Sequence, residues 1–170
     1  GVDQQRVAAI VRELLIALGE DPDREGLHKT PDRVAASWAD LLSGSARDAA
    51  AALDGVIPVG DVDTVLPATS GVVLMRDIRF RSVCEHHLLP FAGRAHIAYL
   101  PGAAVVGFGS IGGVVEVVAG RLQVQERLGE EIATTIMTSL APLGVLVVLD
   151  AAHHCVTMRG STQSESSTVT

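Results

Sequence analysis

The sequence contains little positive charge and few aromatic side chains. Its 170 residues include a single lysine, Lys29, and twelve arginines against twenty acidic residues, which gives a formal net charge of −7. This excess of negative charge repels a phosphate backbone, so we exclude nucleic acid as a partner. Only five residues are Phe, Trp or Tyr, although 48% of the chain is hydrophobic. The core of one domain is therefore thin, and we expect oligomerisation to cover the remaining apolar surface.

Long hydrophobic runs and a cysteine framework are also missing. The longest apolar stretch, residues 143–149, is far shorter than the ~20 residues that a membrane helix needs. The first residues, GVDQQRVAAI, lack the cationic and then apolar layout of a signal peptide. We therefore predict a cytoplasmic protein with no membrane partner. Two cysteines are too few for a disulfide scaffold, and in a reducing compartment such a pair more often binds metal or reacts.

Helical spacing dominates the N-terminal part of the chain. Apolar residues recur at helical intervals over residues 3–18 and again over residues 30–42, where Thr30 and Pro31 open the second helix. The Ala-rich residues 46–53 predict a third, short helix. Two prolines and three glycines then fall within residues 55–71, a composition typical of a linker. We therefore divide the chain into an N-terminal helical region, residues 1–55, and a second domain, residues 56–170.

The second domain alternates between strand and helix patterns. Residues 72–83 and 93–100 alternate and are rich in β-formers, and residues 144–152 and 153–160 give two further strand candidates. Between these pairs, residues 124–140 predict a helix with apolar side chains at four-residue steps, namely Leu128, Ile132, Ile136 and Leu140. The Ser/Thr-rich tail has nothing to bury. This order predicts an α+β fold with helices on one face of a largely antiparallel sheet.

Four of the six histidines adjoin the two cysteines. Residues 84–87 read Cys-Glu-His-His, and residues 153–155 read His-His-Cys. A Cys-x-x-His pair can put both donors on one side of a turn, and a distant thiolate can complete a three-ligand zinc site whose fourth position stays open for water. The candidate metal ligands are therefore Cys84, His87 and Cys155. A closed structural zinc site, with one of the spare histidines as fourth ligand, remains an alternative.

The remaining histidines are sorted by strand geometry. On a strand, residues two apart share a face, so His153 goes with Cys155 and His154 points away. His153 and His86 then become free imidazoles beside the metal, suited to proton transfer near neutral pH. His154 and His96 are expected to be structural or surface groups. The pattern therefore predicts a hydrolytic metal site.

Four segments together resemble the signature segments of the GTP cyclohydrolase I family. They are EGLHKTPDRV (25–34), CEHHLLPFAG (84–93), GRLQVQERL (120–128) and HHCVTMRG (153–160). The resemblance implies the tunnelling fold (T-fold), in which a four-stranded antiparallel sheet carries paired helices on one face. It also implies a homo-oligomer, in which five subunits join their sheets into a barrel and two pentamers stack as a decamer.

The resemblance also implies the roles of individual residues. It assigns Zn²⁺ to the three candidate ligands and proton transfer to His86 and His153. In the family reaction, water activated at zinc adds to C8 of the purine, a histidine protonates the ring nitrogen as the imidazole ring opens, and formate leaves. Sugar rearrangement and ring closure then yield dihydroneopterin triphosphate, the entry to folate and biopterin synthesis.

The same resemblance implies a set of substrate-binding residues. Glu126 corresponds to the carboxylate that accepts hydrogen bonds from the guanine edge, with Gln125 beside it. Arg159 and Arg33 correspond to cations at the substrate phosphates. Without the resemblance, Glu126 alone would be read as an acid that the helix dipole stabilises.

One segment departs from the family pattern. Where the family reads approximately Gly-Leu-Ser-Lys-Leu-x-Arg, residues 107–113 read Gly-Phe-Gly-Ser-Ile-Gly-Gly, so Ser110 replaces the lysine and Gly113 the arginine. Ser110 is retained as a substrate-binding candidate. Two charge-assisted phosphate contacts are missing, each worth ~1.5–3 kcal/mol.

This departure leads to three hypotheses. The favoured one is a specialised paralogue that opens a guanine-type ring with fewer or no phosphates. The second is a genuine GTP cyclohydrolase I with a weaker phosphate grip. The third is a non-catalytic module that binds a purine or pterin and holds a structural zinc.

Overall fold

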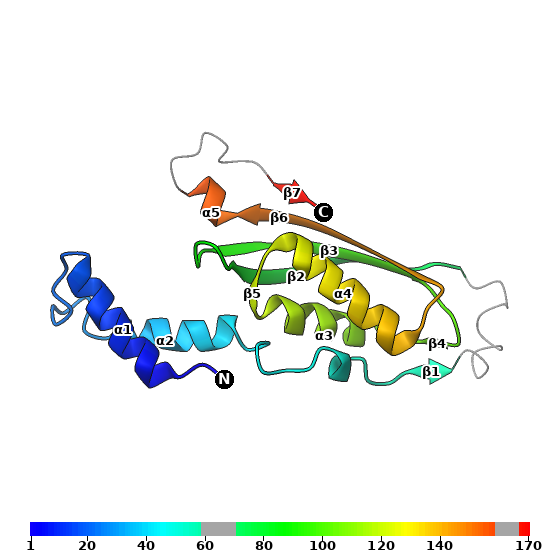
Figure 1. Cartoon of the computed structure of the whole chain (residues 1–170), viewed down its shortest axis with the longest axis horizontal. Helices are drawn as coiled ribbons and strands as arrows, with labels where there is room; N and C mark the ends of the chain where they lie inside the picture. The colour runs from blue at the N-terminus through cyan, green and yellow to red at the C-terminus, as the bar shows by residue number, and fades with distance from the viewer. Residues whose placement is uncertain (59–70, 159–166) are drawn as a thin grey trace.

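Two helices form the N-terminal part of this computed structural model, which describes residues 1–58, 71–158 and 167–170. Helix α1 (Gln4–Ala17) begins after Asp3, whose carboxylate accepts a hydrogen bond from the Arg6 amide at 3.0 Å. Helix α2 (Thr30–Leu41) carries Pro31 in its first turn. The two helices pack together and project from one end of the sheet (Figure 1). The third predicted helix is only a 3₁₀ turn, η1 (Ala50–Ala52).

Three long strands build the sheet. Strands β2 (Val73–Cys84), β3 (Pro90–Leu100) and β6 (Gly144–His153) pair antiparallel in the order β2-β3-β6. Two short strands extend the sheet: β5 (Leu122–Gln123) lies parallel to β2, and β7 (Thr168–Val169) lies antiparallel to β6. Strands β1 (Ile57–Pro58) and β4 (Ala104–Val105) form a separate antiparallel pair.

Two helices cover one face of this sheet (Figure 1). They are α3 (Phe108–Ala119), which packs on β2, and α4 (Gln125–Leu140), which packs on β6. The four apolar residues expected on the inner face of the second helix are all buried. The predicted α+β fold, with helices on one face of an antiparallel sheet, is therefore confirmed. No helix in the described part of the chain is long and apolar enough to cross a membrane.

The prediction of a separate strand over residues 153–160 is wrong for the residues that the structure describes. β6 ends at His153, and the next residues form a single helical turn, α5 (His154–Thr157). The Met158 amide donates to the His154 carbonyl at 3.0 Å and the Thr157 hydroxyl to the His153 carbonyl at 3.1 Å, and these bonds close the turn. The sequence predicted that His153 and Cys155 are alternate residues of one strand. In the structure, His153 ends β6 and Cys155 lies in α5.

The end of the Ser/Thr-rich tail is paired. Thr170 and Leu149 exchange two backbone hydrogen bonds of 2.8 and 2.9 Å, which continue the β6–β7 ladder. The side chains of the described tail residues 167–170 are nevertheless exposed, as expected for a tail with nothing to bury. The chain ends beside the strand that leads to Cys155.

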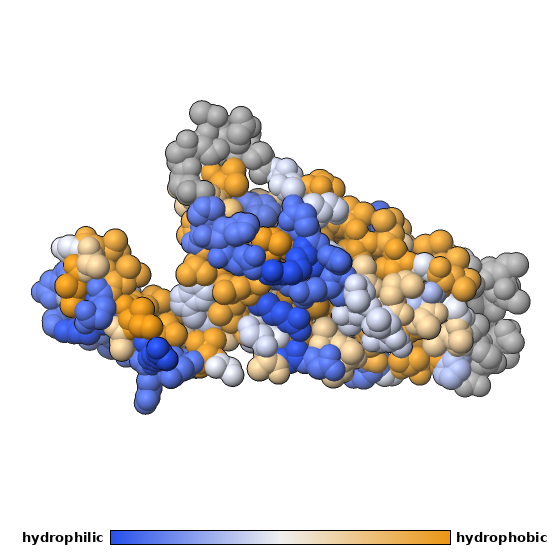
Figure 2. Space-filling view, in the orientation of Figure 1, coloured by the Kyte–Doolittle hydropathy of each residue, from blue (hydrophilic) through white to orange (hydrophobic). Residues whose placement is uncertain are grey.

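Hydrophobic side chains remain exposed on two surfaces. Leu14 of α1 keeps 52% of its surface exposed, and Leu146 of β6 keeps 61%, on the sheet face that the helices leave uncovered. Figure 2 shows hydrophobic residues toward both ends of the molecule around a hydrophilic patch over the start of α4. A single subunit therefore leaves apolar area open, which is the surface that an oligomer would cover.

Candidate active site

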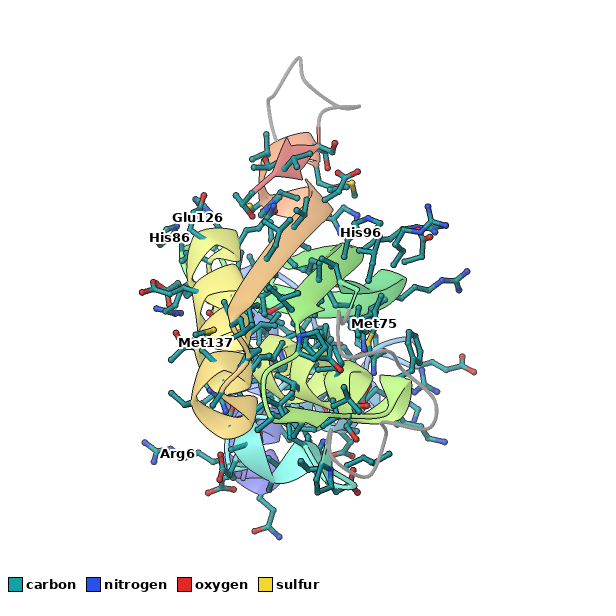
Figure 3. All side chains as sticks on the ribbon, turned by 90° about the vertical axis from the view of Figure 1, so that its right-hand side faces the viewer. Arg6, Met75, His86, His96, Glu126 and Met137 are labelled. Atoms are coloured by element: carbon teal, nitrogen blue, oxygen red, sulfur yellow. The ribbon has the colours of Figure 1, made fainter. Side chains whose placement is uncertain are left out.

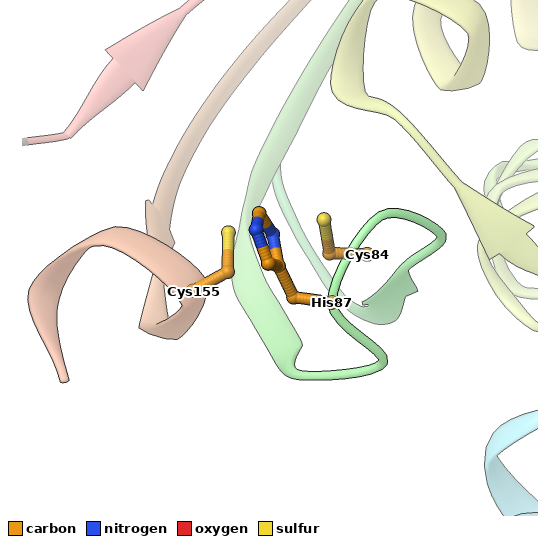
Figure 4. Close-up of side chains that lie close together, drawn as sticks. All are labelled: Cys84, His87 and Cys155. Atoms are coloured by element: carbon orange, nitrogen blue, oxygen red, sulfur yellow. The ribbon is translucent and has the colours of Figure 1, made fainter. Parts of the chain in front are cut away.

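The three candidate metal ligands come together in space. Cys84 ends β2, His87 lies in the following turn and Cys155 lies in α5, and their ligand atoms are all within 4.8 Å of one another. Figure 4 shows the His87 ring between the two sulfur atoms. Both cysteines are buried, whereas His87 is exposed. Two sulfur donors and one imidazole can hold a metal ion with an open side toward solvent.

Backbone hydrogen bonds shape the turn that carries His87. The Cys84 amide donates to the Leu89 carbonyl and the Leu88 amide donates to the Cys84 carbonyl, both at 2.9 Å. Leu88 has φ 55°, in the left-handed region that non-glycine residues rarely adopt. The turn thereby folds His87 back onto the side of Cys84.

An ion pair fastens this turn to α4. The Glu85 amide donates to the Gln123 carbonyl at 3.0 Å, and the Arg127 guanidinium donates to the Glu85 carboxylate and to the Gln123 side chain. The hydrogen bond from Arg127 lowers the pKa of Glu85 below its ordinary value. This contact was not predicted from the sequence, because Gln123 ends β5 and Arg127 lies in α4, and only the fold brings Glu85 to them.

His86 and Glu126 lie at the open side of the site. The His86 side chain is 66% exposed, and its ring meets the His87 ring edge to face at 6.3 Å. Glu126 is exposed in the first turn of α4. Both side chains project from the same edge of the molecule in Figure 3. These two groups are therefore free to meet a molecule that arrives from solvent.

His153 makes more contacts within the protein than the exposed His86 does. Its ring stacks on Phe91 at 4.7 Å with an angle of 4° between the planes, and its Nε2 lies 2.7 Å from Oε1 of Gln125. Burial lowers the pKa of His153 below its ordinary value, and the nearby charge of Glu126 offsets part of this shift. Burial therefore disfavours the charged form of this imidazole. The stacking partner Phe91 was not foreseen, and no local sequence signal identifies it.

Gln125 is occupied by contacts within the chain. The side chain is buried, and Nε2 donates to the Leu149 carbonyl at 3.1 Å, to the Thr168 carbonyl at 2.8 Å and to the Thr170 hydroxyl at 3.1 Å. Its expected contact with substrate stays a prediction.

Ser110, Arg33 and Arg159 are the other predicted substrate-binding residues. The Ser110 hydroxyl donates to the carbonyl and to the carboxylate of Asp54, at 2.8 and 3.0 Å. Arg33 is exposed on α2, and its guanidinium makes no ion pair with a described residue. Arg159 lies outside the described residues. The structure does not join Ser110 or Arg33 to the cysteine cluster by a hydrogen bond.

A cavity of about 680 Å³ lies beside the glycine-rich start of α3. Its lining includes Gly109, Gly112 and Gly113 of α3 and the arginines Arg79 and Arg81 of β2. Arg81 is paired with a carboxylate of α2, whereas Arg79 has no ion pair among the described residues. The cavity beside the part of α3 that lacks the family's cations is therefore lined by two arginines of β2 and by the carboxylates of Asp40 and Glu116.

Comparison with known proteins identifies the family of the chain. The sequence model of the family "GTP cyclohydrolase I" matches residues 7–170. The protein named GTP cyclohydrolase 1 in Leifsonia xyli is 51% identical over 172 residues, covering 100% of this chain and 86% of that protein. The proteins of the same name in Acetivibrio thermocellus and Caldanaerobacter subterraneus are 45% and 46% identical, over 99% of this chain and 87% and 86% of theirs. The chain belongs to the GTP cyclohydrolase I family.

Proposed function

We propose that the protein is a zinc-dependent GTP cyclohydrolase that converts GTP into formate and dihydroneopterin triphosphate. The observation that carries this proposal is the convergence of Cys84, His87 and Cys155 within 4.8 Å of one another. Relatives at 43–51% identity over nearly the whole chain carry the name GTP cyclohydrolase 1. This supports the second of the three hypotheses drawn from the sequence.

The donor set fits zinc. Two thiolates and one neutral imidazole are ligands that zinc prefers, and three protein donors leave a position open for chemistry. Zinc held by these residues would supply Lewis-acid activation of water. The buried cysteines would hold the ion on the protein side, and the exposed His87 would face the substrate side.

Three further side chains would act on the substrate. The Glu126 carboxylate can accept two hydrogen bonds, from the ring N–H and from the exocyclic amino group of guanine. Neutral His153 can take up a proton, and the solvent-exposed His86 can exchange one with bulk water. One of these imidazoles would protonate the purine ring nitrogen as the first C8–N bond breaks and the ring opens to a formamide. Addition of a second water and cleavage of the second C8–N bond would then release formate.

The comparisons do not support a substrate with fewer phosphates or a non-catalytic module. The favoured hypothesis from the sequence rested on the missing lysine and arginine of α3. Arg79 and Arg81, which line the cavity beside those positions, supply two guanidinium groups on the neighbouring strand. We propose that these two guanidinium groups meet the phosphate end of the substrate, in a cavity that the carboxylates of Asp40 and Glu116 also line.

We also propose that the subunit works as a homo-oligomer, with two stacked pentamers as the expected form. The exposed apolar side chains of α1 and of the outer sheet face support this, because a monomer would leave them in water. Light scattering of the purified protein tests it. A monomeric mass at working concentration would contradict the proposal.

Formate release tests the activity. Zinc-loaded protein is given GTP, guanosine or guanine at matched concentrations, with pterin fluorescence read in parallel. We expect formate and pterin from GTP, and loss of both in His153→Gln. His154→Gln is the matched control, because His154 is the exposed neighbour and should retain activity. Turnover of guanosine or guanine alone would overturn the proposed substrate.

A further inference from the structure

A path of hydrogen bonds joins the last residues of the chain to His153. Gln125, at the first position of α4, lies in the middle of this path and is only 2% exposed. Its amide nitrogen donates to the backbone of β6 and to residues of the C-terminal strand, and its amide oxygen meets His153. Elements far apart in the sequence are thereby connected through one side chain.

The surroundings fix which way the Gln125 amide points. Nε2 lies 2.8–3.1 Å from three oxygen atoms, and two of them, the carbonyls of Leu149 and Thr168, carry no hydrogen. Turning the amide over would place Oε1 against these carbonyls, and two acceptors cannot form a hydrogen bond. Oε1 must therefore face His153.

This orientation decides where His153 carries its hydrogen. Oε1 can only accept, so the 2.7 Å contact requires an N–H at Nε2. This N–H occupies Nε2 in either charge state of the ring, so Nδ1 is the nitrogen that can take up or release a proton. The stack on Phe91 fixes the plane of the ring at the same time. Both the tautomer and the orientation of His153 are thus specified by its neighbours.

We propose that Gln125 is a positioning residue that holds His153 as the Nε2–H tautomer, and that the C-terminal residues Thr168 and Thr170 hold Gln125 in turn. The atom of His153 that exchanges protons with substrate is then Nδ1. The catalytic meaning of this arrangement rests on the proposed function, whereas the tautomer itself does not. This role differs from the substrate contact that the family resemblance implies for Gln125.

The two roles predict different kinetics. A residue that binds the guanine ring raises KM when it is removed. A residue that positions the proton-transfer group lowers kcat and leaves KM unchanged, because the substrate loses no contact. Loss of such a supporting hydrogen bond typically costs about 10- to 100-fold in activity.

The test uses Gln125→Met, with Gln123→Met as its matched control. Gln123 is equally buried, at 1% exposed, and it bonds to the Val118 carbonyl, to Glu131 and to Arg127 rather than to His153. Because Arg127 also holds Glu85 beside the metal ligands, Gln123→Met is a control for the His153 spectrum and not for kcat. A third variant, Thr170→Val, removes one acceptor of the Gln125 amide and leaves the Gln125 and His153 side chains in place. Solid-state ¹⁵N NMR of histidine-labelled, zinc-loaded protein reports the tautomer, and His153→Gln assigns the signal.

We expect protonated Nε2 and unprotonated Nδ1 for His153 in the unaltered protein and in Gln123→Met. Gln125→Met should give a mixture of tautomers and a kcat for GTP lowered about 10- to 100-fold at unchanged KM, and Thr170→Val a smaller change in the same direction. An unchanged His153 spectrum in both Gln125→Met and Thr170→Val would overturn the proposal, as would the same spectral change in Gln123→Met. If the unaltered protein releases no formate from GTP, the proposed function fails, and the NMR spectra alone decide the positioning role.

Discussion

Replacing Gly93 by alanine should weaken both the fold and the metal site. Gly93 of β3 lies opposite Ala151 of β6, and a Cβ added there would be 2.0 Å from the carbonyl oxygen of Asp150 and 2.8 Å from the Ala151 Cβ. These atoms belong to backbone or to a side chain that cannot move aside, so the strands must separate by about 1 Å or more. Overpacking of this kind costs ~1–3 kcal/mol, and each weakened ladder hydrogen bond adds ~1 kcal/mol. We expect a loss of about 3 kcal/mol in the free energy of unfolding.

Gly93→Ala should also displace one of the candidate metal ligands. β6 ends at His153 and continues directly into the turn that carries Cys155, so a displaced β6 moves Cys155 relative to Cys84. We expect zinc affinity to fall about 10- to 100-fold. Guanidinium unfolding measures the stability, and competition with a chromophoric chelator measures the affinity.

Gly112→Ala is the matched control. A Cβ added at Gly112 meets nothing within 4 Å, and the residue lies in α3, where alanine is favoured over glycine by ~1 kcal/mol. This variant should be more stable and bind zinc as before. Unaltered unfolding of Gly93→Ala would refute the close approach of β3 and β6. Lower stability with unaltered zinc affinity would refute the coupling between β6 and the site.

Three other predictions concern single side chains. Cys155→Ser should lose bound zinc in elemental analysis and lose formate release, and zinc bound at full stoichiometry would refute its role as a ligand. Ser110→Lys should lower KM for GTP about tenfold or more, because one charge-assisted phosphate contact is worth ~1.5–3 kcal/mol. KM for guanosine should stay unchanged. Equal KM values for GTP in Ser110→Lys and in the unaltered protein would show that the phosphates do not bind beside residue 110. The hydrogen bond from Arg94 lowers the pKa of Asp77 below its ordinary value of 3.8, so the pair stabilises the native state above that pH and loses this contribution as the pH falls through the lowered pKa. Asp77→Asn should therefore flatten the acid side of the profile of Tm against pH, and an identical profile would contradict this.

Much of the fold follows from local patterns. The helical period of α4 identified its buried face, because a helix of 16 residues with one apolar stripe packs only one way on a sheet. Local propensity was misleading for α5, since His-Cys-Val-Thr contains β-formers and still forms a helical turn after β6. Helix α3 forms despite three glycines, because Ile111, Val114 and Val118 are buried against the sheet.

The sequence predicted those parts of the candidate site whose residues are close together in the chain. The spacing of Cys84 and His87 indicated one side of a turn, and the structure brings Cys155 to the same place. The contacts of His153 could not be predicted, because Phe91 and Gln125 lie 62 and 28 positions away in the sequence. Only the pairing of β3 with β6 and the packing of α4 bring these side chains together.

The placement of the three metal ligands has a consequence for how the chain holds together. Cys84 and His87 follow β2, Cys155 follows β6, and β3 lies between these strands. A bound ion is therefore a reversible cross-link across one end of the sheet, closing a loop of about 70 residues. An ion that binds only the folded chain stabilises it by ~2.7 kcal/mol at a hundred times its Kd. The concentration of the free metal ion therefore sets how strongly the ends of β2 and β6 are held together.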